Sequence, residues 1–195
     1  MQATKDSNRK LVISMNMTID GFISGPDCEL QWHLECWTTQ MAEFMCSQLE
    51  KANTILFGRK TYQGMAQYWG AKGADLCIPL EDRAIRELMN RHEKVVFSNT
   101  LEDFHWANTK CVKSNPIGEI QALKQREGKD IIIYGSAQLS QTLLENDLVD
   151  ELHLWVHPVA LGGGKILFTG LNKLSLLDVK AFRSGVVVLI YKCGR

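Results

Sequence analysis

Short apolar runs alternate with amphipathic stretches along most of this chain. Residues 11–16 form an apolar run bounded by polar residues, which predicts a first strand. Four further runs are short enough to be single buried strands, and they lie at residues 54–57, 95–97, 131–134 and 152–156. Between them, helical spacing or helix-start signals predict helices near residues 39–52, 61–69, 80–91, 116–123 and 136–145. The pattern predicts strand–helix alternation.

Local signals refine this pattern at several boundaries. Thr38 or Thr39 suits the N-cap of the first long helix, and Pro116 suits the first turn of another. The last third differs, because residues 180–182 and 186–192 predict a closing hairpin around a Ser-Gly turn. Strand–helix alternation implies right-handed crossovers and parallel pairing. The expected fold is therefore α/β: a three-layer α/β/α arrangement with a mixed, mostly parallel twisted sheet, closed by a C-terminal antiparallel hairpin.

Length and composition set the scale of the molecule. A chain of 195 residues fits one domain, which we place at residues 10–195 after a flexible N-terminal arm at 1–9. Hydrophobic residues make up 45% and charged residues 23%, and the formal net charge is zero. This charge balance gives no indication that the protein binds nucleic acid or an anionic membrane. The longest apolar run, at residues 186–191, is far too short to span a bilayer.

The cysteines indicate a reducing environment. There are six, at positions 28, 36, 46, 77, 111 and 193, and no two form a CxxC pair. Disulfide frameworks belong to short secreted chains, and the polar start of this sequence has no secretory signal. We therefore expect a cytoplasmic protein.

One strand end carries unusual chemistry. Gly58 follows the apolar run at 54–57 and lets the backbone approach a ligand, while Arg59 and Lys60 add positive charge and Thr61 adds a hydroxyl at a helix start. A solvated basic turn with Thr61 as N-cap explains these residues equally well. The segment is not a Walker A loop, because the upstream glycine of that motif is missing.

Two other strand ends are similar. Gly135, Ser136, Ala137, Gln138 and Leu139 form a strand–glycine–helix junction, a geometry that can seat a pyrophosphate on backbone amides. Ser98, Asn99 and Thr100 are short polar residues that could hold a ribose or a 2′-phosphate, although a capping cluster is an equal explanation. Ligands of open α/β sheets bind at the carboxyl ends of strands, so the three ends together predict one nucleotide site.

Two longer segments carry a family resemblance. The sequence SMNMTIDGFI at 14–23 is similar to the S-x-DG-x-I opening of one branch of the dihydrofolate reductase-like superfamily. The sequence HPVALGGGKILF at 157–168 resembles the P-x-x-x-G-x-G-x-x-L-F segment of the same branch. That branch is similar to the C-terminal reductase domain of the bifunctional riboflavin deaminase-reductase, and the resemblance covers nearly the whole chain.

The resemblance implies an NADPH-dependent reductase, expected as a homodimer acting on a small-molecule substrate. By it, Arg59, Lys60 and Thr61 contact the adenosine-side phosphates, and 98–100 line the ribose. It places 135–139 at the pyrophosphate, and Met15 and Asn16 at the nicotinamide. The deaminase motif H-x-E…P-C-x-x-C is absent from the sequence, so another chain would supply any deamination.

The substrate side of the resemblance is incomplete. Dihydrofolate reductases carry a carboxylate on their first long helix and a Gly-Gly pair, whereas this chain has no acid cleanly placed there and has Gly135-Ser136. Both departures argue against dihydrofolate as the substrate. Asp20 is the leading candidate proton donor, although Asp-Gly is also a plain turn signal, and Trp32 is a candidate for the substrate wall.

Three functions therefore stay open. A reductase similar to 5-amino-6-(5-phosphoribosylamino)uracil reductase ranks first, dihydrofolate reductase second, and a non-catalytic nucleotide-binding module is the rival from another class. No metal is expected, because Cys28, His33 and Cys36 lack a standard zinc spacing and a fourth ligand. We interpret His153 and His157, four apart on one strand face, as a polar edge.

Overall fold

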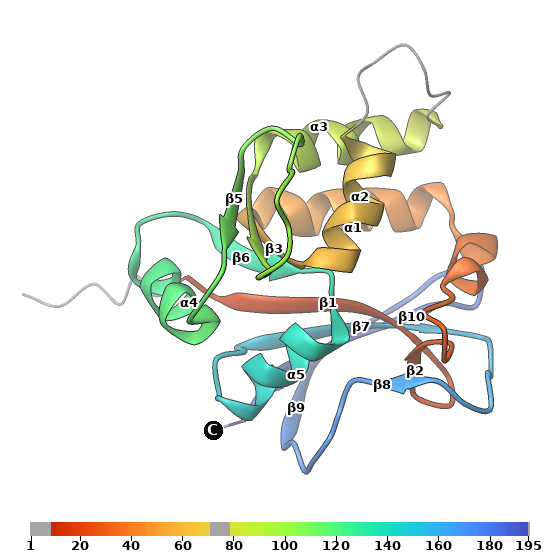
Figure 1. Ribbon diagram of the computed structural model, residues 1–195. Coiled ribbons are helices and arrows are strands. Elements are labelled where there is room, and N and C mark those ends of the chain that lie inside the picture. The colour runs from red at the N-terminus through yellow and green to blue at the C-terminus, as the bar shows by residue number, and fades with distance from the viewer. Residues whose placement is uncertain (1–8, 71–78, 195) are drawn as a thin grey trace, which may run out of the picture.

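The computed structural model describes residues 9–70 and 79–194, and Cys77 lies outside these ranges. Eight strands form one sheet in the order β5-β4-β3-β6-β1-β7-β10-β9 (Figure 1). The strands of this sheet are β1 (Leu11–Thr18), β3 (Ala52–Gly58), β4 (Glu93–Phe97), β5 (Thr109–Val112), β6 (Asp130–Ile133), β7 (Glu151–His157), β9 (Leu174–Ala181) and β10 (Val187–Cys193). Short strands β2 (Phe22–Ser24) and β8 (Lys165–Ile166) pair separately.

The six strands from β5 to β7 in this order are parallel, and β10 and β9 add antiparallel pairs. This confirms the predicted mixed sheet with its closing hairpin. β9 starts at Leu174, however, well before the residues predicted for it, and β5 and the β2–β8 pair were not predicted.

Helices cover both faces of the sheet, as predicted. The helices are α1 (Thr39–Lys51), α2 (Arg59–Trp69), α3 (Arg83–Arg91), α4 (Pro116–Gln125) and α5 (Ala137–Glu145), with 3-10 turns η1 (Gln31–Cys36) and η2 (Leu80–Asp82). Side chains alternate across each strand, so Val12 and Phe57 join a core with α1 to α3, while Ile13 and Leu56 join a second core with α4 and α5. The result is the three-layer arrangement (Figure 1).

The predicted helix starts have the expected caps. The Thr38 hydroxyl accepts a hydrogen bond from Met41 N at 3.4 Å, so Thr38 rather than Thr39 caps α1. Pro116 occupies the first turn of α4 after Asn115, whose side chain accepts from Gly118 N. These caps satisfy amides that the helix itself leaves unpaired.

Arg9 is packed into the fold, which differs from the flexible arm predicted at that residue. Arg9 is 5% exposed, and its guanidinium donates to Asn53 Oδ1 at 2.6 Å and to Thr54 Oγ1 at 2.7 Å. A long cationic side chain is buried only when its donors are satisfied. Arg9 therefore ties the start of β1 to β3. Residues 1–8 lie outside the described part.

A second buried cation, Lys94 on β4, anchors the end of α3. Its ammonium donates to the backbone oxygens of Met89, Asn90 and His92 at 2.8, 3.2 and 2.7 Å. All three donors are used on carbonyls at a helix C-terminus, where a positive charge is favourable. Within residues 9–70 and 79–194, no helix is long and apolar enough to cross a membrane.

Candidate functional site

The candidate site is a row of strand ends along one edge of the sheet. β4, β3, β6, β1 and β7 are consecutive and parallel, so their carboxyl ends meet at the same edge. The three predicted loops follow β4, β3 and β6, while β1 ends at Thr18, two residues after Asn16, and β7 ends at His157. The structure therefore brings the three loops together as neighbours.

Two of the loops are in direct contact. Gly58 N donates to Gly135 O at 3.3 Å, which joins the turn after β3 to the turn after β6. A Cβ atom on Gly58 would lie 2.4 Å from Ser136 Oγ, and one on Gly135 would lie 3.1 Å from Thr61 Oγ1. Gly135 also has φ +124°, which favours glycine, and its peptide bond to Ser136 is cis. Both glycines are needed for this contact.

The helix starts that follow these turns differ in how they are capped. Gly58 offers α2 no side-chain cap, and Arg59 and Lys60 are exposed without a hydrogen bond or ion pair to any residue described. Ser136 caps α5, its hydroxyl accepting from Leu139 N at 3.5 Å. The start of α2 thus presents free amides beside two unpaired cations, which suits an anion.

The third loop is partly committed to its own turn. Ser98 Oγ accepts from Thr100 N at 3.1 Å and from Leu101 N at 3.0 Å, which is the capping role considered above. The side chains of Asn99 and Thr100 are exposed. Since Gly58 pairs with Phe97 in the sheet, this loop lies next to the start of α2.

Met15 and Asn16 point to opposite faces of the sheet. Met15 is buried in the core that contains Leu139 of α5. The Asn16 side chain faces the other way, where its Oδ1 lies 3.1 Å from Nε2 of His157. The two side chains therefore cannot line the same face of one ligand ring.

His157 is a site residue that the sequence analysis missed. It was predicted to lie on a polar edge, but β7 is flanked by β1 and β10, and His157 is fully buried opposite Thr18. Burial, with a smaller contribution from His33, lowers the pKa of His157 from 6.5 to about 4. Its imidazole is therefore neutral at pH 7. The signal in the sequence was a polar residue at the end of an apolar run, which is also the pattern that precedes the three predicted loops.

Trp32 lies against His157, as a substrate-wall residue would. The Trp32 and His157 rings meet edge to face with centroids 5.2 Å apart, and His33 lies 6.2 Å from His157. Trp32 Nε1 donates to Glu29 O at 3.2 Å, and His33 Nδ1 bonds Leu30 O. Both rings come from η1, none of whose residues is buried.

Asp20 is bound to the loop that follows β7. Its Oδ1 accepts from Thr18 Oγ1 at 2.5 Å, and its Oδ2 accepts from Leu161 N at 3.0 Å and from Gly162 N at 2.7 Å. These bonds, that from Thr18 first, lower the pKa of Asp20 below its usual value. An ionised carboxylate accepts protons rather than donates them, so this environment favours a clamp over the predicted proton donor.

The residues weighed as metal ligands do not gather. Cys28 lies 2.5 Å from Lys165 Nζ, and His33 is bonded to backbone. No three His, Cys, Asp or Glu side chains in the described ranges form a metal-sized group.

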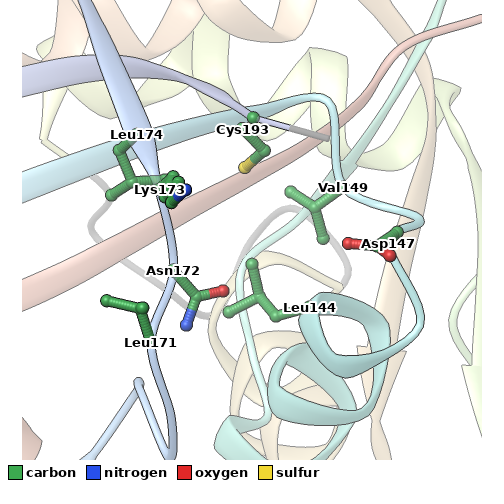
Figure 2. Close-up of a pocket in the computed structure, with 9 residues that line it drawn as sticks. Leu144, Asp147, Val149, Leu171, Asn172, Lys173, Leu174 and Cys193 are labelled. Atoms are coloured by element: carbon green, nitrogen blue, oxygen red, sulfur yellow. The ribbon is translucent and has the colours of Figure 1, made fainter.

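A surface hollow of about 220 Å³ lies on the side of the sheet away from the candidate site, at the amino end of β7 (Figure 2). It is lined by the end of α5, the turn before β7, the start of β9 and the end of β10, including Leu144, Asp147, Lys173 and Cys193. Parallel sheets bind ligands at the carboxyl ends of their strands, and this hollow lies at the amino end of β7. It is separate from the candidate site.

The strand order and the row of loops define a three-layer α/β protein with a mostly parallel sheet. The chain belongs to the RibD C-terminal domain family, whose pattern matches residues 9–188. The uncharacterized protein YyaP of Bacillus subtilis (strain 168) is 33% identical over 186 residues, covering 94% of each chain.

Two solved structures share the fold. A putative riboflavin biosynthesis protein from Shewanella sp. PV-4 superposes with a TM-score of 0.70 at 19% identity, over 95% of this chain and 99% of that one. Dihydrofolate reductase from Enterococcus faecalis, complexed with NADP(H), gives 0.56 at 15% identity, over 95% and 97%. The resemblance seen in the sequence is thus confirmed for family and fold.

Proposed function

We propose that this protein is an NADPH-dependent reductase that transfers a hydride to a small heterocycle of the pyrimidine class, as in 5-amino-6-(5-phosphoribosylamino)uracil reductase. The observation that carries the proposal is the Gly58–Gly135 contact, which sets the starts of α2 and α5 side by side. Two neighbouring helix starts suit the two phosphates of a dinucleotide. Membership of the RibD C-terminal domain family supports the same class of reaction.

The residues present fit the cofactor's phosphate end. The uncapped amides of α2 and the unpaired side chains of Arg59 and Lys60 would hold phosphate oxygens, and Asn99 and Thr100 would lie beside a ribose. When bound, NADPH supplies the hydride. Asn16 lies on β1, two strands from β3, and would face the nicotinamide ring of the cofactor. His157 and Trp32 would line the substrate side of the site.

Neither Asp20 nor His157 is poised to donate the accompanying proton. Asp20 is clamped as a carboxylate, and His157 is neutral at pH 7 with its Nε2 facing Asn16. We therefore propose that water delivers the proton and that this chain contributes mainly by positioning its ligands. The sequence departures on the first long helix and at Gly135-Ser136 also disfavour dihydrofolate.

Cofactor binding tests the proposal. NADPH should raise the melting temperature of the purified protein well above the effect of NADH, since a ligand that binds only the native state stabilises it. The variant R59A/K60A should lose most of this shift, whereas K180A/K192A, which removes two exposed cations from β9 and β10, should keep it. If neither cofactor shifts melting, the reductase proposal fails.

Turnover separates the reductase from a non-catalytic nucleotide-binding module. NADPH oxidation should be measured with the pyrimidine ribosylamine, dihydrofolate, quinones and aldehydes. Binding of NADPH without oxidation in any of these would favour the module.

The resemblance also leads us to propose a homodimer. β9 is an edge strand of the sheet, and Leu176, Leu177 and Val179 on it are exposed, so a second copy would cover apolar surface there. Sedimentation velocity that returns a monomer at working concentration would refute this.

A further inference from the structure

His157 carries a buried polar atom that nothing in the described chain satisfies. Its Nδ1 is inaccessible to solvent and has no hydrogen-bond partner in residues 9–70 and 79–194. More than nine-tenths of buried polar groups in native proteins are paired, so an exception calls for a physical reason. A ligand that supplies the missing partner is one such reason.

The hydrogen-bond pattern fixes what that partner must be. Nε2 of His157 faces the amide oxygen of Asn16 at 3.1 Å, so Nε2 carries the ring hydrogen of the neutral imidazole. Nδ1 is then a lone-pair acceptor. It can be satisfied only by a donor, an N–H or an O–H.

The neighbouring rings cannot supply this donor. Trp32 Nε1–H is committed to Glu29 O, and His33 Nδ1 to Leu30 O. Both rings nevertheless contact His157 edge to face and cover it from η1. No residue of η1 is buried, although Cys36 packs against the core with α1 to α3, so a ligand would reach His157 by displacing the Trp32 and His33 rings.

The position of His157 in the sheet places this acceptor beside the expected substrate. Under the proposed function, the three loops after β4, β3 and β6 hold the phosphate and ribose end of the cofactor, and Asn16 on β1 lies at its ring end. β7 is the next strand along the edge, so His157 lies one strand beyond the reacting end. That is where the substrate has to lie.

We infer that Nδ1 of His157 accepts a hydrogen bond from a ring N–H or amine of the substrate, and that the site thereby selects planar heterocycles that carry such a donor. This inference rests on the proposed function for the direction of the cofactor. The aromatic rings of Trp32 and His33 supply flat apolar surface for the substrate ring, and His157 accepts a hydrogen bond from the edge of that ring. Analogues without an N–H leave Nδ1 unpaired and are rejected.

A matched pair of variants tests the inference. H157N keeps a polar group near the position of Nδ1, and H157Q keeps one near Nε2, where it can still bond Asn16. The probe is 5,6-diaminouracil, titrated by calorimetry into protein saturated with NADPH, and 1,3-dimethyluracil, which has no N–H, is the control ligand. We expect H157N to bind the probe within about threefold of the wild type and H157Q to bind it at least about tenfold more weakly. The control ligand should bind the two variants with the same affinity.

The outcomes separate the inference from the proposed function. Equal losses in both variants, or a greater loss in H157N, would overturn the role of Nδ1. The NADPH affinity of each variant is measured separately, because the Asn16 partner of His157 lies at the ring end of the cofactor, and probe binding is compared only at saturating NADPH. If the wild type fails to bind NADPH, the proposed function falls while the inference is decided by a second measurement.

That measurement is ¹⁵N NMR of histidine-labelled protein without cofactor. The His157 resonances, assigned by their loss in H157Q, should show the Nε2–H tautomer in the free protein and an Nδ1 shift on addition of 5,6-diaminouracil but not of 1,3-dimethyluracil. The opposite tautomer, or an Nδ1 resonance that does not respond to millimolar probe, would show that the inference is wrong.

Discussion

Replacing His157 by glutamine should flatten the pH dependence of stability between pH 6.5 and 4. The pKa of this histidine is lowered from 6.5 to about 4 by burial, so in this window the unfolded chain binds a proton that the folded chain does not. The free energy of unfolding therefore falls as the pH decreases through this range. Each pH unit is worth about 1.4 kcal/mol, so the full shift corresponds to about 3 kcal/mol.

The wild type has further histidines that act in the same direction. Burial also lowers the pKa values of His33, His92 and His153, so H157Q should keep part of the slope. Glutamine retains a group near Nε2 that can bond Asn16, which limits the loss of packing. The variant isolates the titration of one buried ring.

The assay is urea unfolding followed by tryptophan fluorescence, at a series of pH values from about 7.5 to about 4.5, with two-state behaviour checked at each. The difference in unfolding free energy between wild type and H157Q should shift by about 2–3 kcal/mol in favour of H157Q across this range. Parallel curves for the two proteins would refute the reasoning, because His157 would then titrate equally in the folded and unfolded chains.

Three other substitutions test the fold and the site. G58A should lower the melting temperature and weaken NADPH binding at least about tenfold, because its Cβ would lie 2.4 Å from Ser136 Oγ; G58A/S136G should recover both, and no recovery would refute the steric argument. K94M should cost about 2–3 kcal/mol in urea unfolding, since three carbonyl oxygens lose their donor; a neutral result would contradict that role. D20N should weaken the clamp on the 161–162 segment and speed limited proteolysis there, with turnover retained if water delivers the proton; abolished turnover with unchanged proteolysis would restore Asp20 as the proton donor.

The sequence predicted those parts of the fold whose apolar pattern is decided locally. β1, β3, β4 and β6 are largely buried on both faces and contain short apolar runs, and α1 and α4 begin at residues whose side chains cap them. β5 was missed because it is an edge strand of four half-exposed residues, TKCV. The start of β9 was missed because most of that strand is exposed and a bulge opposite Ile190 and Tyr191 breaks its alternation.

The sequence predicted those site residues that directly follow a strand. It did not predict the residues whose surroundings depend on which distant strands lie side by side in the sheet. Gly58 and Gly135 could be proposed as neighbours because ligands of open α/β sheets bind at the carboxyl ends of the strands. The strand order of the sheet places the two glycines in contact. His157 could not be placed, because its burial depends on β10 lying beyond β7, which no local pattern reveals. Nor could the Asp20 clamp, since its partners lie about 140 positions away in the sequence.

β1 has partners that are synthesised much later than itself. Leu11 pairs with Ile131 of β6, and Thr18 pairs with His157 of β7. At about 5–20 residues per second, a ribosome takes roughly 6–24 s to make the intervening chain of about 120 residues. During that interval a strand built to be buried on both faces, with Leu11 and Ile13 fully enclosed in the finished protein, has no sheet to join. β1 therefore stays without its partner strands until β6 and β7 have been made.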